Sequence, residues 1–416
     1  MPKATHPLNV ESPLGVRWDA PLTLHGYQRA VFETDHLPID GLRTAALGLF
    51  GEVGSLLSVV KKRKRDAAAY SGYEDAIIEE LGDVLWYFTC LANRASLDLS
   101  ILAQQAIPHG SVAEATDGFG TWASIQASLR VSDEDLFQAM SRLAERSGAL
   151  VGALGAHRGP AQCDDTSARL LSILQAIVGT AEATDVDLDR AVTKNLEKVF
   201  SRYPRTFEYP ALADAALPAH ERLPRRFELF IGEHEVNGKT YVIQTCNGVI
   251  VGDRLTDNKA EPDDYRFHDV FHVAYAVHLG WSPILRGLFR VKRKSRPALD
   301  ENEDGARAGL IEEGIATFIF GRALERHFFE GLESLDFDLL KLVRGFVRGF
   351  ESERCALWQW ERAILDGFRI FRELKKYRKG CLVADLEAHT LEFRPAGLEL
   401  QGSEAVGSSV VVGHRD

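Results

Sequence analysis

The segment AIIEELGDVLWY, residues 76–87, places three carboxylates inside an apolar run. Residues three or four apart share one face of a helix, so Glu80 and Asp83 are expected to point the same way, with Glu79 on an adjacent side. Burying carboxylates without a partner is costly. Mg²⁺ would offset this cost, because it takes oxygen ligands and commonly bridges carboxylates to substrate phosphates. The spacing therefore predicts a magnesium site.

A second apolar segment, GLFGEVGSLL, supplies a further acid, Glu52. If the two segments form antiparallel helices, Glu52 is the natural third ligand. The alternative is that all these acids are surface carboxylates at the edges of amphipathic stripes, with Lys61, Lys62 and Arg63 as counter-charges. Residue types and spacing leave both interpretations open.

The elements that must position these acids are helices. From about 22 to 205 apolar residues recur at three- and four-residue intervals, and strand signals are nearly absent. After about 226 the pattern alternates, and the pairs Asn237-Gly238 and Asn247-Gly248 are hairpin signals. We therefore expect a mainly α protein, with a helical bundle followed by an α+β domain of helices and short β-hairpins.

The helical region has two similar halves. An offset of 89 residues pairs Leu97-Asp98-Leu99 with Val186-Asp187-Leu188, which suggests an internal duplication. The expected boundaries are a first repeat at 22–106, a degenerate second repeat at 107–205, a linker at 206–226, an α+β domain at 227–399 and a flexible tail at 400–416.

Four segments together, YQRAVFETD, LGLFGEVGSLLSVVKK, EELGDVLWY and KNLEKVFSRYP, resemble the all-α nucleoside triphosphate pyrophosphohydrolases of the MazG type. The signature of that family is E-x-x-E followed by E-x-x-D, four acids on two antiparallel helices that bind Mg²⁺ and a triphosphate. Glu52, Glu80 and Asp83 match the first, third and fourth acids. Ser55 replaces the second acid, and Glu79 is the residue that would compensate for it.

The resemblance also implies phosphate contacts. A late helix of the family carries an Asn, a Lys and an Arg at the spacing of Asn195, Lys198 and Arg202, and Lys61 or Lys62 would add a further cation. Trp86 and Tyr87, with Trp122, are the expected contacts of the base. The plain alternatives are a basic helix C-terminus that complements the helix dipole, and aromatic residues of a bundle core. Listed together, the expected substrate contacts are Lys61, Lys62, Trp86, Tyr87, Asn195, Lys198 and Arg202.

The two halves keep complementary residues. The first half has the acids, whereas Arg169 and Ser172 stand where the second half would have Glu80 and Asp83. Family members form their sites in bundles made by association of subunits, so a fused pseudo-dimer with one composite site would explain the division. A homodimer of the whole chain is also compatible with the sequence.

The resemblance implies a Mg²⁺-dependent hydrolase, with Mn²⁺ as the alternative ion, that converts NTP or dNTP to NMP and pyrophosphate. Glu52 or Glu80 would order or deprotonate the attacking water. Because Ser55 removes one charge from the site, a nucleotide-binding sensor or regulatory protein with weak or no turnover remains a rival function.

A second polar cluster lies in the C-terminal half. His268 and His272 are four residues apart with Asp269 between them, and Glu312 and Glu313 are further donors. This set suits a metal site, which makes a metal-dependent hydrolase centred on this half another rival function. Alternatively, the histidines form hydrogen bonds to Glu312 or Glu313 within a structural core.

Composition limits the remaining choices. The chain has 416 residues, 45% of them hydrophobic, and a formal net charge of −11, so a broad nucleic-acid surface is not expected. We find no apolar run of about 18 residues or more and no apolar signal core. The five cysteines lack paired spacing. These features predict a cytoplasmic protein without a membrane partner.

Overall fold

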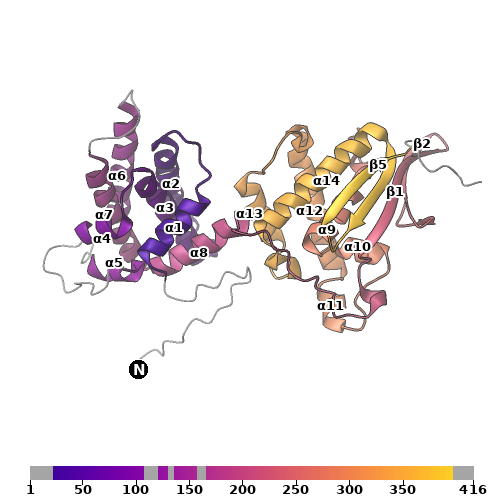
Figure 1. Cartoon of the computed structure of the whole chain (residues 1–416), viewed down its shortest axis with the longest axis horizontal. Helices are drawn as coiled ribbons and strands as arrows, with labels where there is room; N and C mark the ends of the chain where they lie inside the picture. The colour runs from indigo at the N-terminus through magenta and orange to yellow at the C-terminus, as the bar shows by residue number, and fades with distance from the viewer. Residues whose placement is uncertain (1–21, 107–119, 130–134, 157–164, 397–416) are drawn as a thin grey trace, which may run out of the picture. The chain divides into compact units, whose positions relative to one another are not determined.

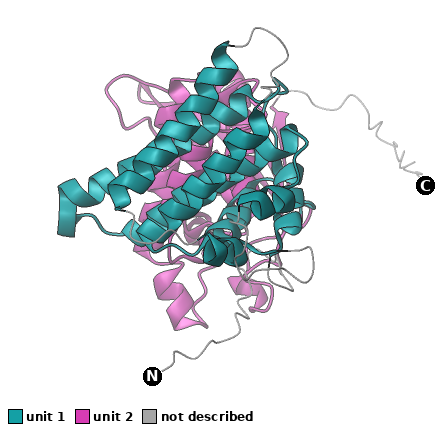
Figure 2. Ribbon diagram, turned by 90° about the vertical axis from the view of Figure 1, so that its left-hand side faces the viewer, with its two compact units in different colours: residues 1–207 teal, residues 208–416 magenta. Residues whose placement is uncertain are grey.

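The computed structural model describes residues 22–106, 120–129, 135–156 and 165–396. The chain divides into two compact units, Met1–Phe207 and Glu208–Asp416 (Figure 2). The first unit is helical and the second combines helices with a small antiparallel sheet (Figure 1). This confirms the expected class, mainly α with a C-terminal α+β part. The expected tail at 400–416 lies outside the described residues.

Helices form the whole regular structure of the described part of the first unit. In chain order they are α1 (Leu24–Thr34), α2 (Arg43–Asp66), the 3₁₀ turn η1 (Ala67–Ala69), α3 (Tyr73–Arg94), α4 (Leu99–Ala106), α5 (Trp122–Ser128), α6 (Leu136–Ala156), α7 (Thr166–Thr184) and α8 (Leu188–Arg202). Helix α2 packs along α3 and α6 along α7, while α2 also contacts α6. The last helix of each half crosses over: α8 packs on α3, and α4 packs on α7. One core runs through all of these contacts.

Two glutamines make the same pair of hydrogen bonds in the two halves. The side-chain amide of Gln28 donates to the Leu97 carbonyl at 2.8 Å and accepts from the Leu99 amide at 2.9 Å. Gln126 donates to the Val186 carbonyl at 2.8 Å and accepts from the Leu188 amide at 3.0 Å. Each glutamine thus fixes the start of the last helix of one half.

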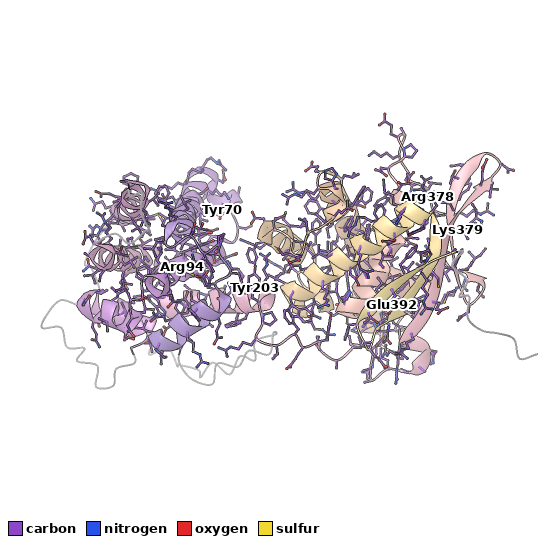
Figure 3. All side chains as sticks on the ribbon, turned by 45° about the horizontal axis from the view of Figure 1, so that its top comes forward. Tyr70, Arg94, Tyr203, Arg378, Lys379 and Glu392 are labelled. Carbon is purple, nitrogen blue, oxygen red and sulfur yellow. The ribbon has the colours of Figure 1, made fainter. Side chains whose placement is uncertain are left out.

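Arg94 holds the connection between α1 and α2. It lies at the C-terminal end of α3 (Figure 3) and forms two hydrogen bonds to the Asp35 carboxylate, at 2.7 and 2.8 Å. It also donates to the carbonyls of Leu37, Pro38 and Gly41. One guanidinium therefore bonds a carboxylate and three backbone carbonyls of a loop that has no regular structure.

The sheet of the second unit has the order β3-β2-β1-β4-β5, with every neighbouring pair antiparallel. Its strands are β1 (Arg226–Val236), β2 (Lys239–Cys246), β3 (Val249–Ile250), β4 (Lys379–Asp385) and β5 (Thr390–Pro395). Both Asn-Gly pairs close hairpins, and all four of these residues have positive φ angles between 53° and 77°. The hairpin prediction is therefore confirmed.

Helices accompany this sheet in the described part of the second unit; the first and the last of them pack on it, and helices and strands share the core (Figure 1). The helices are α9 (Asp269–Leu279), α10 (Pro283–Leu288), α11 (Pro297–Asn302), α12 (Ala306–Leu324), α13 (Phe337–Phe346) and α14 (Leu357–Tyr377). Every residue of α9 is buried. Helix α14 packs closely on it, because a Cβ at Gly367 would lie only 3.2 Å from the Phe271 ring. At the end of α14, Arg378 bonds Glu233 of β1 and Asp264 (Figure 3).

Most of the stretch expected as a linker, 206–226, belongs to the second unit, whose boundary lies at Glu208. Asp214 is 2% exposed and accepts hydrogen bonds from Arg225 at 2.7 Å and from the buried Arg286 at 2.8 Å. It also accepts from the Leu223 amide at 2.8 Å. The proline- and alanine-rich composition suggested a linker, but these buried ion pairs fix the segment against the domain.

Two further features bear on compartment. Among the described residues, one helix, Arg43–Ala69, is long and apolar enough by length and composition to cross a bilayer. Its apolar side packs on α3 and α6, as core helices of bundles commonly do. Cys90, Cys246, Cys355 and Cys381 are free thiols. Cys163 lies outside the described residues.

The Asp214 network gives a stability prediction. Replacing Asp214 by Asn leaves Arg286 buried without its closest charge partner, so we expect the second unit to lose about 3 kcal/mol of unfolding free energy. Burial raises the pKa of Asp214, but the hydrogen bonds from Arg225, Leu223 and Arg286 outweigh it and lower the pKa. The carboxylate therefore stabilises the fold above its unfolded-state pKa of about 3.9 and loses this effect as pH falls further.

Urea unfolding of the full chain, followed by amide hydrogen exchange in residues 208–396, measures this loss. The exposed Glu333, replaced by Gln, is the matched control and should change nothing. Equal stability of the Asp214→Asn variant and the wild type at pH 7 would show that the network is not stabilising.

Candidate functional site

Helices α2 and α3 form a hairpin closed by the short connection 67–72, and three acids meet across it. Glu52 comes from α2, while Glu80 and Asp83 come from α3, one helical turn apart. One carboxylate oxygen of each lies within 4.8 Å of the others, and all three side chains are half-buried. The hairpin thus brings together the acids that the sequence singled out.

Their arrangement fits a hard divalent cation. Six-coordinate Mg²⁺ at about 2.1 Å from its ligands holds neighbouring oxygens about 3 Å apart and opposite ones about 4 Å apart. The three carboxylate oxygens, all within 4.8 Å of one another, lie close to that spacing. Because the acids are half-buried, the remaining positions face water. The donors are oxygens alone, which suits Mg²⁺ or Mn²⁺ better than softer metals.

Helix α8 brings an amide and a cation to the same place. The Asn195 side chain is 3% exposed and donates to Asp83 Oδ1 at 2.7 Å. The Lys198 ammonium donates to both oxygens of Asp83 and lies 3.4 Å from Glu79 Oε1. Asn195 Oδ1 is buried and has no hydrogen-bond partner. The two residues of α8 therefore bear directly on one acid of the cluster.

Two glycines permit this close packing. A Cβ at Gly82 would lie 2.7 Å from the Ala191 carbonyl and 3.0 Å from Asn195 Cβ, so α8 reaches α3 only because position 82 is glycine. A Cβ at Gly48 would lie 2.1 Å from the Tyr87 ring. Neither glycine was expected from the sequence. The available signal was weak, because α2 holds three glycines, at 48, 51 and 54, and Gly82 of α3 lies among large apolar residues.

Tyr87 lies beside the acids, and Trp86 does not face them. Burial, followed by the nearby carboxylates Glu52 and Asp83, raises the pKa of Tyr87 to about 12, so its phenol keeps its proton at neutral pH. Trp86 is 8% exposed and donates its indole N–H to Thr34 at 3.1 Å. Trp122 is fully buried and packs edge-on against Tyr27. Both tryptophans are core residues.

The remaining residues that the sequence led us to expect at the site lie on α2 and α8. Ser55 lies one turn after Glu52 on α2 and is half-buried. Arg202 lies one turn after Lys198 and sits over the Tyr203 ring, 5.1 Å from its centroid. Lys61 and Lys62 are exposed. Nine residues separate Lys61 from Glu52, which is about 13 Å along the helix, so these lysines are not brought to the acids.

The C-terminal cluster also forms. One ligand atom each from His268, Asp269 and His272 lie within 4.8 Å of one another, and all three residues are buried. Glu313 reaches both imidazoles, and Glu312 hydrogen-bonds His272 at 2.9 Å. Burial lowers the pKa of His272, but Glu312 and Glu313 outweigh it and raise the pKa well above its ordinary value. The two carboxylates therefore favour positive charge at this histidine.

Comparison with known proteins supplies two domain matches and one relative. The MazG nucleotide pyrophosphohydrolase domain matches residues 41–109, which hold α2, α3 and the three acids. The MazG C-terminal domain matches residues 208–397, almost the whole second unit. Residues 110–207 lie between the two matches. The Gene 37 protein of Mycobacterium phage L5 is 36% identical over 88 residues, which cover 19% of this chain and 77% of that protein. No solved structure matches.

The first match covers the hairpin that brings the acids together, and the second covers the α+β unit that follows the bundle. Together with the order of the helices, they agree with the family expected from the sequence. The chain belongs to the MazG-type family of nucleotide pyrophosphohydrolases and carries the MazG C-terminal domain in addition.

Proposed function

We propose that the first unit is a Mg²⁺-dependent nucleoside triphosphate pyrophosphohydrolase, which releases pyrophosphate from an NTP or dNTP and leaves the monophosphate. The observation that carries the proposal is the meeting of Glu52, Glu80 and Asp83 across the α2–α3 hairpin. The matched pyrophosphohydrolase domain, residues 41–109, contains all three. A reduced cytoplasmic compartment suits the free thiols of the described cysteines.

Each group at the site has a part in this reaction. Glu52, Glu80 and Asp83 would hold Mg²⁺, and the ion would supply positive charge to the phosphates at the bond under attack. A water oxygen bonds to the α-phosphorus, and the bond to the bridging oxygen breaks so that pyrophosphate leaves. Glu52 or Glu80 orders this water and accepts its proton.

Lys198 supplies the positive charge that the leaving pyrophosphate needs. In the absence of substrate, the ammonium neutralises Asp83 and lies near Glu79. When a triphosphate and its metal are bound, Lys198 transfers its hydrogen bonds to phosphate oxygens, and Arg202 extends the grip by one turn. The buried Asn195 stays on Asp83 and keeps that carboxylate in place.

We further propose that the bundle is a fused pseudo-dimer, residues 22–106 and 107–205, with one composite site. Support comes from the matched hydrogen bonds of Gln28 and Gln126 and from the crossing of the last helices. The second half has Arg169 and Ser172 at the positions of Glu80 and Asp83, so it contributes α8 but no second set of acids.

Tyr87 is the proposed contact of the base, since its half-buried ring borders the acids and its phenol remains a hydrogen-bond donor. Ser55 favours one rival function, a nucleotide sensor, because the family pattern has an acid there. A site with three acids instead of four binds Mg²⁺ more weakly.

The central prediction compares two acids of α3, Asp83 and Asp75, that both pair with lysines of α8. We expect Asp83→Asn to lower pyrophosphate release by about 100-fold or more, because it removes a metal ligand and the partner of Lys198. Asp75→Asn is the matched control: Asp75 pairs with Lys194 at 2.8 Å at the exposed end of the same interface, where an ion pair contributes little. Assays use each NTP and dNTP with Mg²⁺. Equal rates for both variants, or orthophosphate as the product, would refute the proposal.

Ser55 gives a test that separates enzyme from sensor. Ser55→Glu restores a fourth acid, so we expect the Mg²⁺ concentration for half-maximal turnover to fall about tenfold. Gly54→Glu adds the same charge about 200° around α2 from Glu52, where a Cβ meets nothing within 4 Å, and should leave that concentration unchanged. If the wild type binds nucleotide without turnover above that of Asp83→Asn, the sensor function is correct.

Gly82 tests the composite site. Gly82→Ala should push α8 away from α3, cost about 1–3 kcal/mol of stability and lower turnover by roughly 100-fold through misplacement of Asn195 and Lys198. Gly152→Ala on α6 is the control, because a Cβ there meets nothing within 4 Å and should not lower stability. Full activity of a folded Gly82→Ala variant would show that the docking of α8 is not needed.

A further inference from the structure

Helix α9 carries polar side chains into an apolar core. His268, just before its first residue, is 7% exposed, Asp269 is 6% exposed and His272 is 0% exposed. Their neighbours Val270, Phe271 and Val273 are 2% exposed or less. Burying an acid and two imidazoles in such surroundings is costly unless each polar atom is bonded. The polar atoms of His268, Asp269 and His272 therefore each need a bonding partner.

One ring nitrogen of each histidine, Nδ1, already has a hydrogen-bond partner. His268 Nδ1 lies 2.9 Å from the carbonyl of Tyr265, and His272 Nδ1 lies 2.9 Å from Glu312 Oε1. A carbonyl and a carboxylate accept hydrogen bonds, so both Nδ1 atoms carry the proton. A metal ion displaces any proton on Nε2, and the imidazoles in this tautomer then present the Nε2 lone pair to it. Metal-binding histidines are oriented in the same way, by a carbonyl or carboxylate on the other nitrogen.

The two Nε2 atoms face a common point. His272 Nε2 is fully buried and has no hydrogen-bond partner. It lies 3.4 Å from Glu313 Oε1, while His268 Nε2 lies 3.2 Å from Asp269 Oδ1 and 3.7 Å from Glu313 Oε2. Tetrahedral Zn²⁺ with ligands at about 2.1 Å holds its donor atoms about 3.4 Å apart. The measured separations therefore fit donors around one ion.

The carboxylates divide into ligands and supports. Glu312 is 0% exposed and accepts from Ser282 Oγ at 2.6 Å, from the Ile284 amide at 2.8 Å and from His272, so its role is to orient the imidazole. Gln244, from β2, donates to Asp269 Oδ2 and leaves Oδ1 for the metal. Glu313 is 37% exposed and closes the site from the solvent side.

His278 shows what a structural histidine looks like in the same helix. Its Nδ1 lies 3.0 Å from the Tyr209 hydroxyl and its Nε2 lies 2.9 Å from Asp366 Oδ2, so both nitrogens are used within the protein. His268 and His272 differ, because each bonds at Nδ1 while its Nε2 lies 3.2 Å or 3.4 Å from a carboxylate oxygen. The alternative expected from the sequence, hydrogen bonds to Glu312 or Glu313, is met at His272 Nδ1, whereas the Nε2 atoms of both histidines lie more than 3 Å from a carboxylate oxygen.

We propose that the second unit binds one divalent first-row transition metal ion, Zn²⁺ in the first place. Its ligands are His268 Nε2, His272 Nε2, Asp269 Oδ1 and Glu313. The spacing of the two histidines, four residues apart on one helix, is that of helical zinc sites. The ligand set is softer than the oxygen-only cluster of the first unit and selects a different ion. The chain thus holds two metal sites of different chemistry, one in each unit.

The test uses the full chain with Asp83→Asn, which removes a ligand of the first site. After chelator treatment, incubation with Zn²⁺ and removal of excess metal, we expect one equivalent of zinc per chain. Co²⁺ should give the strong visible absorption of a four-coordinate ion. Because the Glu313 side chain is partly exposed, Glu313→Gln should preserve the fold. It should lower zinc affinity by about tenfold or more.

His268→Ala and His272→Ala, each in the same background, should lose the zinc and the cobalt absorption. Glu325→Gln on the exposed surface is the control and should keep both. Circular dichroism establishes that each variant is folded. Zinc content below a tenth of an equivalent in the Asp83→Asn chain, or equal zinc affinity of folded Glu313→Gln and control, would overturn the proposal.

Discussion

The contact of Asp83 with Lys198 and Asn195 is the interaction on which the first unit depends. It joins α3, which carries two of the acids, to α8, the last helix of the bundle. A carboxylate this close to apolar residues needs compensation, and an ammonium and an amide provide it without closing the site to a metal. Gly82 makes the approach of the two helices sterically feasible. The same contact sets the distance between the acids and the proposed phosphate grip.

Local periodicity was sufficient to place Glu80 and Asp83 together, since they share a helix face wherever that helix packs. The two Asn-Gly hairpins were equally local, because positive φ angles at both positions are a property of those residues. The docking of α8 on α3 was anticipated only as a hypothesis from the division of residues between the halves, since nothing local specifies which helix another helix contacts.

Other residues expected at the site lie away from the acids for physical reasons that sequence spacing does not carry. Lys61 and Lys62 follow the acids closely in sequence, but a helix rises about 1.5 Å per residue and carries them away. Trp86 adjoins Tyr87, yet neighbouring residues on a helix point about 100° apart, so one ring enters the core and the other borders the acids. The stretch 206–226 has the composition of a linker, and Asp214 with its buried arginine partner holds it in the second unit.

The candidate metal sites of the two units differ in the burial and type of their ligands. In the first, half-buried oxygens face water, which suits a hard ion that keeps its own waters and a substrate that comes and goes. In the second, buried imidazoles are oriented by groups that are themselves fixed, which suits an ion bound tightly. The family match covers the acids of the first unit and almost the whole of the second, but not the helices between them.

The most direct test of the composite site is a crystal structure of the full chain with Mg²⁺ and a non-hydrolysable nucleoside triphosphate. The account predicts the metal on Glu52, Glu80 and Asp83, with Lys198 moved from Asp83 to phosphate oxygens of the same nucleotide. A triphosphate bound elsewhere, with Lys198 still paired to Asp83, would contradict it.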